Sequence, residues 1–178
     1  MPLLKSGKRV NDPWSRWADE TVDPPAGPLM VSLRQWRGHR DRLLARGTPL
    51  GIRLSSEQTP GEIRDDLSIF DLVALDFPVF TDGRSYSNAR RLRDRYGFKG
   101  EVRATGEVLR DQFQALTRCG FDALEVRDSD TEKTWQLAMD AFSTPYQPAT
   151  DDRPTVMSLR QRRLGGDLIA DTPGSSDV

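Results

Sequence analysis

The sequence is poor in the residues that build metal and thiol sites. It holds one cysteine, Cys119, and one histidine, His39, among 178 residues. A single cysteine excludes an internal disulfide, and with one histidine it is too few for a zinc or iron-sulfur site built from this chain alone. We therefore expect no metal site, and no cofactor is evident. Redox chemistry would require a bound organic cofactor or a partner protein.

Long apolar runs and an excess of one charge are also lacking. No run approaches the roughly 20 apolar residues that a membrane span needs, and Met1 leads into no apolar signal segment. The 26 Lys and Arg balance 27 Asp and Glu, which leaves no overall attraction to nucleic acid or anionic lipid. We expect a cytoplasmic protein that binds neither nucleic acid nor membrane.

The chain also lacks the motifs of common nucleotide and thiol-redox sites. It has no Gly-x-x-x-x-Gly-Lys loop, no Gly-x-Gly-x-x-Gly and no Cys-x-x-Cys. Cys119 follows Leu116 by three residues on an apolar helical stripe, which favours core packing over a reactive thiol. These absences argue against standard nucleotide and thiol chemistry.

Between residues 28 and 147, short apolar segments alternate with amphipathic helical patterns. The predicted strands are Leu29–Ser32, Leu50–Leu54, Leu72–Phe80, Glu101–Ala104 and Ala123–Arg127. They are rich in Val, Leu and Ile with little alternation, which is typical of a parallel sheet buried on both faces. The predicted class is α/β, with about five βα units and a parallel sheet. The sheet is either open and doubly wound or curved into a partial (β/α) barrel.

The helix boundaries carry their own signals. Thr59–Glu62 and Ser129–Glu132 each read as a capping box that starts a helix. Gly97 and Gly120 are predicted left-handed residues just after a helix end, each followed by a phenylalanine that folds back on a leucine. These positions divide the helices from the strands that follow.

The two ends of the chain differ in composition from the centre. Residues 1–27 read as a flexible arm that docks through Trp14 and Trp17. Residues 148–178 are rich in Pro, Asp, Gly and Ser, which predicts a disordered tail. Residues 28–147 are therefore expected to form a single α/β domain.

Arginines and turn residues crowd where the predicted strands feed helices. In an open α/β sheet, that edge is where ligands bind. The turn at Asp82–Ser87 can hold an anion on free backbone N–H groups beside arginine side chains. The alternative is a surface helix whose arginines pair with Asp94 and Glu101. No catalytic residue is assigned, and the candidate anion or ligand site comprises Asp82, Gly83, Arg84, Tyr86, Arg90, Arg103, Asp111 and Gln112.

Arg103 lies inside a predicted buried strand and therefore needs an acceptor. Desolvating an unpaired guanidinium costs several kcal/mol, so Arg103 must meet Asp76, Asp111 or an anionic ligand. Asp76 is equally out of place in the middle of its strand. We predict a contact between Asp76 and Arg103 on adjacent strands.

Several segments together resemble the bacterial family known as domain of unknown function 934. They are Phe77–Ser87, Ala89–Arg90, Gly100–Ala104, Val108–Gln112 and Arg118–Ala123, and the likeness covers about residues 28–147. The resemblance implies a link to assimilatory sulfur metabolism. Members of the family are assigned to sulfite reduction as oxidoreductases because their genes lie near that of sulfite reductase.

Three functions are considered, and the link of the first to sulfite reduction is what the resemblance implies. The favoured one is an accessory protein of sulfite reduction that binds a sulfur oxyanion, or docks sulfite reductase or another sulfur-assimilation enzyme. The second is a small enzyme acting on a phosphorylated or carboxylated metabolite, with Asp82 or Asp111 as general base. The third is a non-catalytic interaction scaffold that grips its partner with Trp14 and Trp17.

Overall fold

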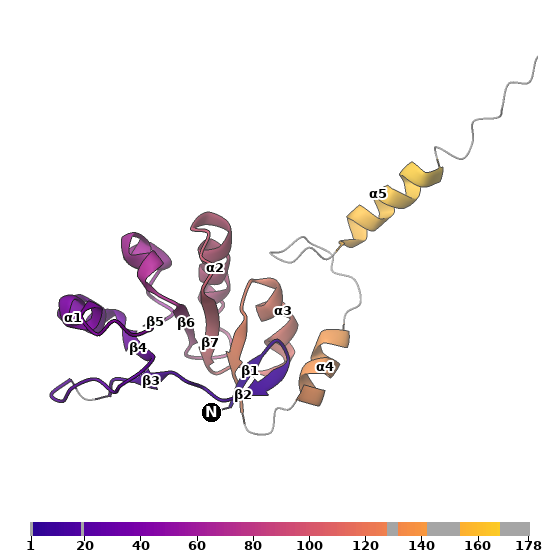
Figure 1. Cartoon of the computed structure of the whole chain (residues 1–178). Coiled ribbons are helices and arrows are strands. Elements are labelled where there is room, and N and C mark those ends of the chain that lie inside the picture. The colour runs from indigo at the N-terminus through magenta and orange to yellow at the C-terminus, as the bar shows by residue number, and fades with distance from the viewer. Residues whose placement is uncertain (1, 19, 128–131, 142–153, 168–178) are drawn as a thin grey trace, which may run out of the picture.

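Eight strands form one sheet in the order β2-β1-β8-β7-β6-β5-β4-β3 (Figure 1). The computed structural model describes residues 2–18, 20–127, 132–141 and 154–167. The strands are β1 (Leu3–Lys5), β2 (Lys8–Val10), β3 (Ser15–Arg16), β4 (Leu29–Ser32), β5 (Leu50–Leu54), β6 (Leu72–Phe77), β7 (Glu101–Gly106) and β8 (Ala123–Glu125). The helices are α1 (Leu33–Leu44), the 3-10 helix η1 (Pro60–Ile69), α2 (Arg84–Arg90), the π-helix η2 (Arg91–Arg95), the 3-10 helix η3 (Arg110–Gln112), α3 (Phe113–Arg118), α4 (Glu132–Asp140) and α5 (Val156–Asp167).

The sheet is mixed, so the prediction of a parallel sheet of about five strands is wrong in part. Strands β3 to β8 pair in parallel, whereas β1 is antiparallel to both β2 and β8. Ser6 and Gly7 join β1 to β2 with positive φ angles of 49° and 79°, which suit a two-residue hairpin turn. Strands β1 and β2 were not predicted, because each is three residues long and they carry Lys5, Lys8 and Arg9, which leaves no apolar run.

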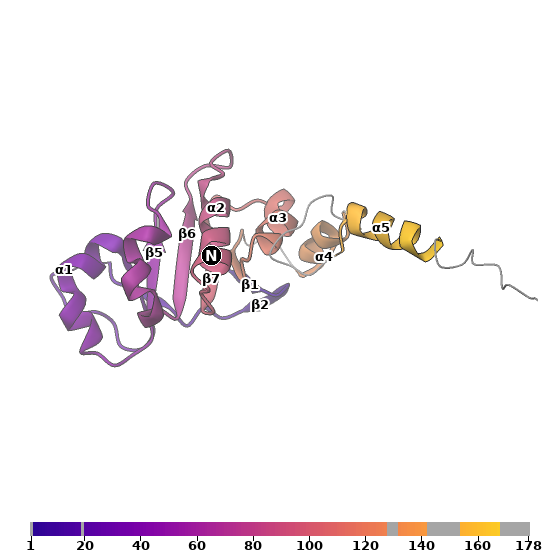
Figure 2. The same cartoon turned by 90° about the horizontal axis from the view of Figure 1, so that it is seen from above.

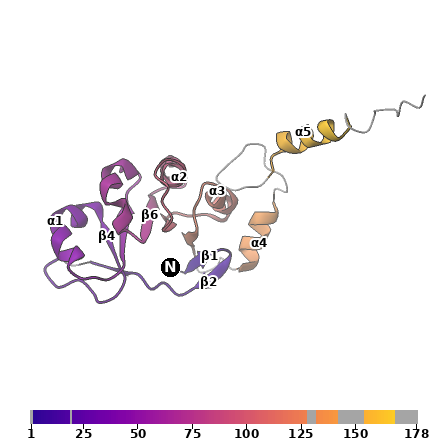
Figure 3. The same cartoon turned by 45° about the horizontal axis from the view of Figure 1, so that its top comes forward.

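The sheet curls into a half-barrel with its helices on the outer face (Figures 2 and 3). Helices α1 and α2 pack on the central strands β4 to β6, while the N-terminal segment runs along the opposite, inner face. A doubly wound sheet carries helices on both faces, so that alternative is wrong and the partial barrel is confirmed in its curvature.

The five strands predicted from apolar runs are all present. Strands β4 and β5 have the predicted bounds, and β7 continues two residues further, to Gly106. Strand β6 ends at Phe77, three residues early, because Pro78 has no N–H with which to continue the ladder. Strand β8 also stops early, at Glu125.

The helix boundary signals at Thr59, Gly97 and Gly120 are confirmed. The Thr59 N–H donates to Glu62 Oε1 at 3.0 Å, which closes the capping box at the start of η1. Gly97 and Gly120 have φ angles of 64° and 97°, and each is followed by a buried phenylalanine. The second capping box lies outside the described residues except for Glu132, where α4 begins.

The C-terminal region is described only in part. Of residues 148–178, predicted to be disordered, the structure describes 154–167, and these contain α5. The others lie outside the described residues. No helix within the described ranges combines the length and apolar character that a bilayer crossing requires.

The N-terminal segment reaches both edges of the sheet. Strand β1 pairs with β8, and β3 pairs with β4 at the opposite edge, so residues 11–14 must cross the inner face between them. We call residues 11–14 the strap. Trp14 of the strap packs on Met30, Leu72 and Ala74 of the inner face, whereas Trp17 is buried in the main core. Both tryptophans therefore pack on the domain, as predicted, but residues 1–27 are not only a docked arm, because they supply β1, β2 and β3 of the sheet.

The main core lies between the outer face of the sheet and its helices. Leu54, Leu75, Phe77 and Val102 of the central strands belong to one buried cluster with Phe113 of α3, and each of these side chains is at most 1% exposed. Burial of this apolar area stabilises the fold by about 25 cal/mol per Å² removed from water. Cys119 is partly buried and packs against this core.

Candidate functional site

Three polar side chains meet on the inner face near the carboxyl ends of β5, β6 and β7. Arg53 Nη2 lies 2.8 Å from Asp76 Oδ1, and the Thr105 hydroxyl donates to the same oxygen at 3.2 Å. These residues alternate with core residues along their strands, which directs them away from the helices. Asp76 is thus held by Arg53.

The predicted contact between Asp76 and Arg103 is wrong. Asp76 pairs in register with Thr105, while Arg103 is paired with Ala74, two residues closer to the amino end. The Arg103 guanidinium binds Glu101 and Asp12, and so it leans away from Asp76. Arg53 fills the role expected of Arg103 because it extends toward the carboxyl end from the neighbouring strand.

A second charged group connects two loops at the same edge. Arg84 Nη2 lies 2.7 Å from Asp82 Oδ2 and 3.0 Å from Ser56 Oγ, so it joins the loop after β5 to the turn after β6. The Arg84 N–H also donates to Asp82 Oδ1 at 3.2 Å, next to Gly83. The turn that was predicted to hold an anion therefore already holds one, the carboxylate of Asp82.

The contact of Arg84 with Asp82 predicts a shifted pKa for the Asp82 carboxyl. Hydrogen bonds from the Arg84 side chain, and then from Ser56, lower the pKa of Asp82 below its ordinary value of 3.8. A lowered folded-state pKa adds stability above the unfolded-state pKa, and this stability is lost as the pH falls below about 4. We expect Arg84→Gln to raise the pKa of Asp82 toward 3.8 and to flatten this acid dependence, as measured by NMR titration of the carboxyl carbon.

Arg90→Gln is the control for this titration. Arg90 pairs with Asp94 at 3.6 Å on the exposed surface of the next turn, where both side chains are about half exposed. Its removal should leave the pKa of Asp82 unchanged. If the pKa of Asp82 stayed unchanged in Arg84→Gln, Arg84 would not be the group that lowers it.

The other predicted site residues do not share one hollow with Arg84. Tyr86 and Gln112 meet in the outer layer. The pKa of Tyr86 is raised, chiefly by burial and then by the nearby Cys119, although the hydrogen bond with Gln112 opposes this shift. Asp111 is exposed beside Arg110, and Arg90 pairs with Asp94, as the surface-helix alternative predicts. Asp82, Gly83 and Arg84 are brought together, whereas Arg103 lies on the inner face.

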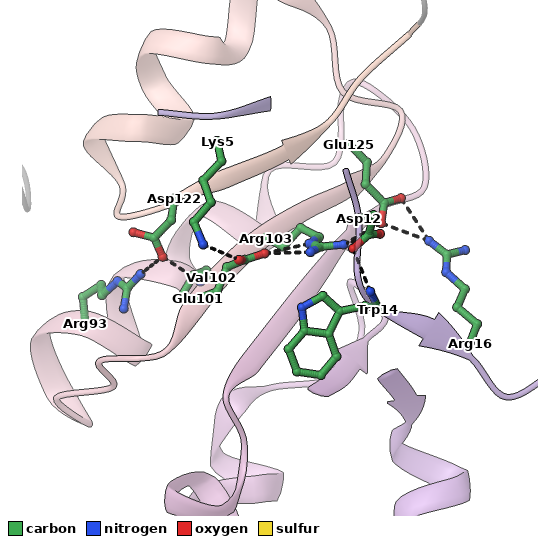
Figure 4. Close-up of polar contacts among 10 residues, drawn as sticks. All are labelled: Lys5, Asp12, Trp14, Arg16, Arg93, Glu101, Val102, Arg103, Asp122 and Glu125. Atoms are coloured by element: carbon green, nitrogen blue, oxygen red, sulfur yellow. Dashed lines mark hydrogen bonds and ion pairs between the residues drawn. The ribbon is translucent and has the colours of Figure 1, made fainter. Parts of the chain in front are cut away.

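Arg103 is the centre of a buried charge network beneath the strap (Figure 4). Its side chain is 0% exposed, and its guanidinium lies 2.7 Å from Asp12, 2.8 Å from Glu101 and 3.7 Å from Glu125. Burial lowers the pKa of Arg103, but Asp12 and Glu101 together outweigh it, so the pKa is raised. Arg103 is therefore a charged structural residue.

Two further cations extend this network to both edges of the sheet. Lys5 of β1 binds Glu101 at 2.9 Å, and Arg16 of β3 binds both oxygens of Glu125 at 3.0 and 3.1 Å (Figure 4). With Arg103 and Asp12, three cations face three carboxylates. The network ties the N-terminal segment to β7 and β8.

Sequence reasoning missed Arg53, Ser56 and the acidic partners of Arg103. Arg53 could have been found, because it lies inside a predicted buried strand and the reasoning used for Arg103 applies to it equally. The same reasoning applies to Glu125, which lies inside the predicted strand Ala123–Arg127. Asp12 could not have been found, because a strap that crosses the sheet leaves no local pattern in the sequence.

An exposed apolar loop completes the carboxyl edge. Pro78, Val79 and Phe80 follow β6 and are all exposed, with Val79 at 51% and Phe80 at 45%. The loop is fixed at both ends, since the Asp82 N–H donates to the Val79 carbonyl at 3.0 Å and the Phe80 N–H to Glu107 Oε2 at 2.9 Å. A rigid apolar tip thus projects beside the two charged groups.

The fold and this edge define an α/β half-barrel protein whose edge arginines are bound to its own carboxylates. The chain belongs to a family of bacterial proteins of unknown function, DUF934, whose family model matches residues 51–157. A comparison with curated proteins finds no match.

Proposed function

We propose that this protein is a non-catalytic accessory protein of assimilatory sulfur metabolism that docks a partner enzyme of sulfite reduction. The pathway rests on the resemblance of its segments to DUF934, described above. The docking role rests on one observation, the rigid exposed loop Pro78–Phe80 at the carboxyl edge. The partner that fits this loop is an enzyme with an apolar recess able to enclose Phe80.

The geometry of the loop suits partner binding. A loop whose backbone is already fixed in the free protein loses less conformational entropy on binding, and aromatic anchors supply much of the energy of an interface. Phe80 and Val79 are held by backbone hydrogen bonds to Glu107 and Asp82, so the loop is ordered before a partner arrives.

Oxyanion binding or catalysis at this edge is less well supported. Arg53 and Arg84, the arginines that face this edge in the two charged groups described above, already hold the carboxylates of Asp76 and Asp82. A general base works best with a pKa near the working pH, and Arg84 shifts the pKa of Asp82 in the opposite direction. Asp111 is 80% exposed beside Arg110, away from these arginines.

The docking role predicts the loss of a partner when the loop tip becomes polar. The double variant Val79→Ser, Phe80→Ser should fold normally, because both side chains are exposed. Affinity capture from cells grown on sulfate should recover sulfite reductase or another enzyme of its pathway with the natural chain. Recovery with the variant should fall at least tenfold, since losing a hot spot costs about 2 kcal/mol or more.

Leu44→Ser provides the matched control. Leu44 is 38% exposed at the end of α1, so its replacement also removes exposed apolar surface, but on a different element from the loop. Equal losses with both variants, or capture of unrelated proteins only, would contradict the docking role. A deletion strain that grows on sulfide but not on sulfite would place the function at the reduction step.

A further inference from the structure

A hollow of about 630 Å³ opens at the amino ends of β6 and β7, opposite the carboxyl edge. It lies between η1 and the turn that leads from η2 into β7. Its volume falls within the range of about 300 to 1,000 Å³ that is typical of small-molecule sites. Three cations, Arg64, Arg95 and Lys99, line it, and none of its lining residues is acidic.

These three cations differ from the arginines of the carboxyl edge. Within the described part of the chain, Arg64, Arg95 and Lys99 form no ion pair and no side-chain hydrogen bond. Arg95 only stacks on Tyr96, with its guanidinium carbon 5.9 Å from the ring centroid. Like charges gathered around a concave surface raise the local positive potential and favour an anion.

The walls of the hollow add an apolar and aromatic component. Phe70 and Phe98 form part of the lining and are packed in the core, which fixes their rings. Tyr96 is half-buried and also contacts the core, so its ring is held beside Arg95. Because Phe70 and Phe98 are only 4% and 7% exposed, a ligand with a flat apolar body would lie against the ring of Tyr96 while its charged group meets the cations.

We propose that this hollow binds a small phosphate or sulfate ester with a ring-bearing body. Arginine forks suit the oxygens of such groups, and three unpaired cations exceed the charge of one ester group. The site lies at the other end of the strands from Pro78–Phe80, so the proposal does not rest on the docking function.

Isothermal titration calorimetry at low salt tests this site with phenyl phosphate, phenyl sulfate, inorganic phosphate and phenol. We expect one of the two esters to bind at least tenfold more tightly than both inorganic phosphate and phenol. Arg64→Ala and Arg95→Ala should each weaken that ester about tenfold, because each removes a charge-assisted contact. Binding should also weaken as NaCl is raised.

Arg91→Ala is the matched control. Arg91 is an exposed arginine of the same helix η2 as Arg95, but it does not line the hollow. Its variant should keep the affinity of the natural chain, and unchanged melting temperatures would show that all three variants fold. Equal weakening by Arg91→Ala and Arg95→Ala, equal binding of phenol and the esters, or no binding of any probe would overturn the proposal.

Discussion

Arg103→Met is expected to lower the free energy of unfolding by about 3 to 5 kcal/mol, the usual cost of removing one partner from a buried ion pair. The substitution keeps much of the side-chain volume but leaves Asp12, Glu101 and Glu125 facing one another beneath the strap. Glu101 and Glu125 would keep Lys5 and Arg16, whereas Asp12 would lose its ion pair. Urea denaturation at pH 7, followed by tryptophan fluorescence, measures the change.

Arg37→Met is the control for this experiment. Arg37 pairs with Glu62 at 3.0 Å on the surface, where its side chain is 59% exposed, so its loss should cost less than about 1 kcal/mol. Asp12→Asn is a milder variant of the same network and should fall between the two. An Arg103→Met effect no larger than that of Arg37→Met would mean that the network does not hold the strap in place.

Gly106→Ala is expected to cost about 2 to 5 kcal/mol, from backbone strain and overpacking together. Gly106 has a φ of 92°, and an added Cβ would lie 2.4 Å from the Phe77 carbonyl oxygen and 2.8 Å from Asp76 Oδ1. The backbone of β6 cannot move aside without breaking its ladder with β7. The variant should also disturb the contact of Asp76 with Thr105.

Gly47→Ala separates the clash from the backbone strain. Gly47 has a φ of 61°, and nothing lies within 4 Å of an added Cβ, so only the cost of the left-handed conformation remains. That cost is about 1 to 2 kcal/mol. Chemical denaturation of both variants gives the difference, and equal losses would show that the close approach at Gly106 is easily relieved.

The sequence predicted the parts of the fold that have a local cause. Apolar runs located the five strands of the helix-covered sheet, and Gly97 and Gly120 marked helix ends because a left-handed residue favours glycine. Strand β1 pairs with β8, more than 100 positions away, and Asp12 of the strap binds Arg103 across 91 positions. The short charged strands β1 and β2 carry no periodic signal of their own.

The candidate site was predicted less well than the fold. The turn around Asp82 and Arg84 lies at the predicted edge, but a sequence does not show which cations already have carboxylate partners. Arg103 needed an acceptor, as inferred, yet its acceptors are Asp12 of the strap and Glu101 of its own strand, and not Asp76. The unpaired cations Arg64, Arg95 and Lys99 had no local feature to separate them from the other exposed basic residues.

The pairing of Leu3 with Glu125 has a consequence for how the chain folds during its synthesis. Strand β1 is translated before β8 and has no neighbour on that side until almost the whole domain has left the ribosome. Contacts this distant in sequence form late, so the N-terminal strands are expected to settle last over a half-barrel that is already assembled. Strand β1 therefore completes the sheet although it is translated before the strand that it pairs with.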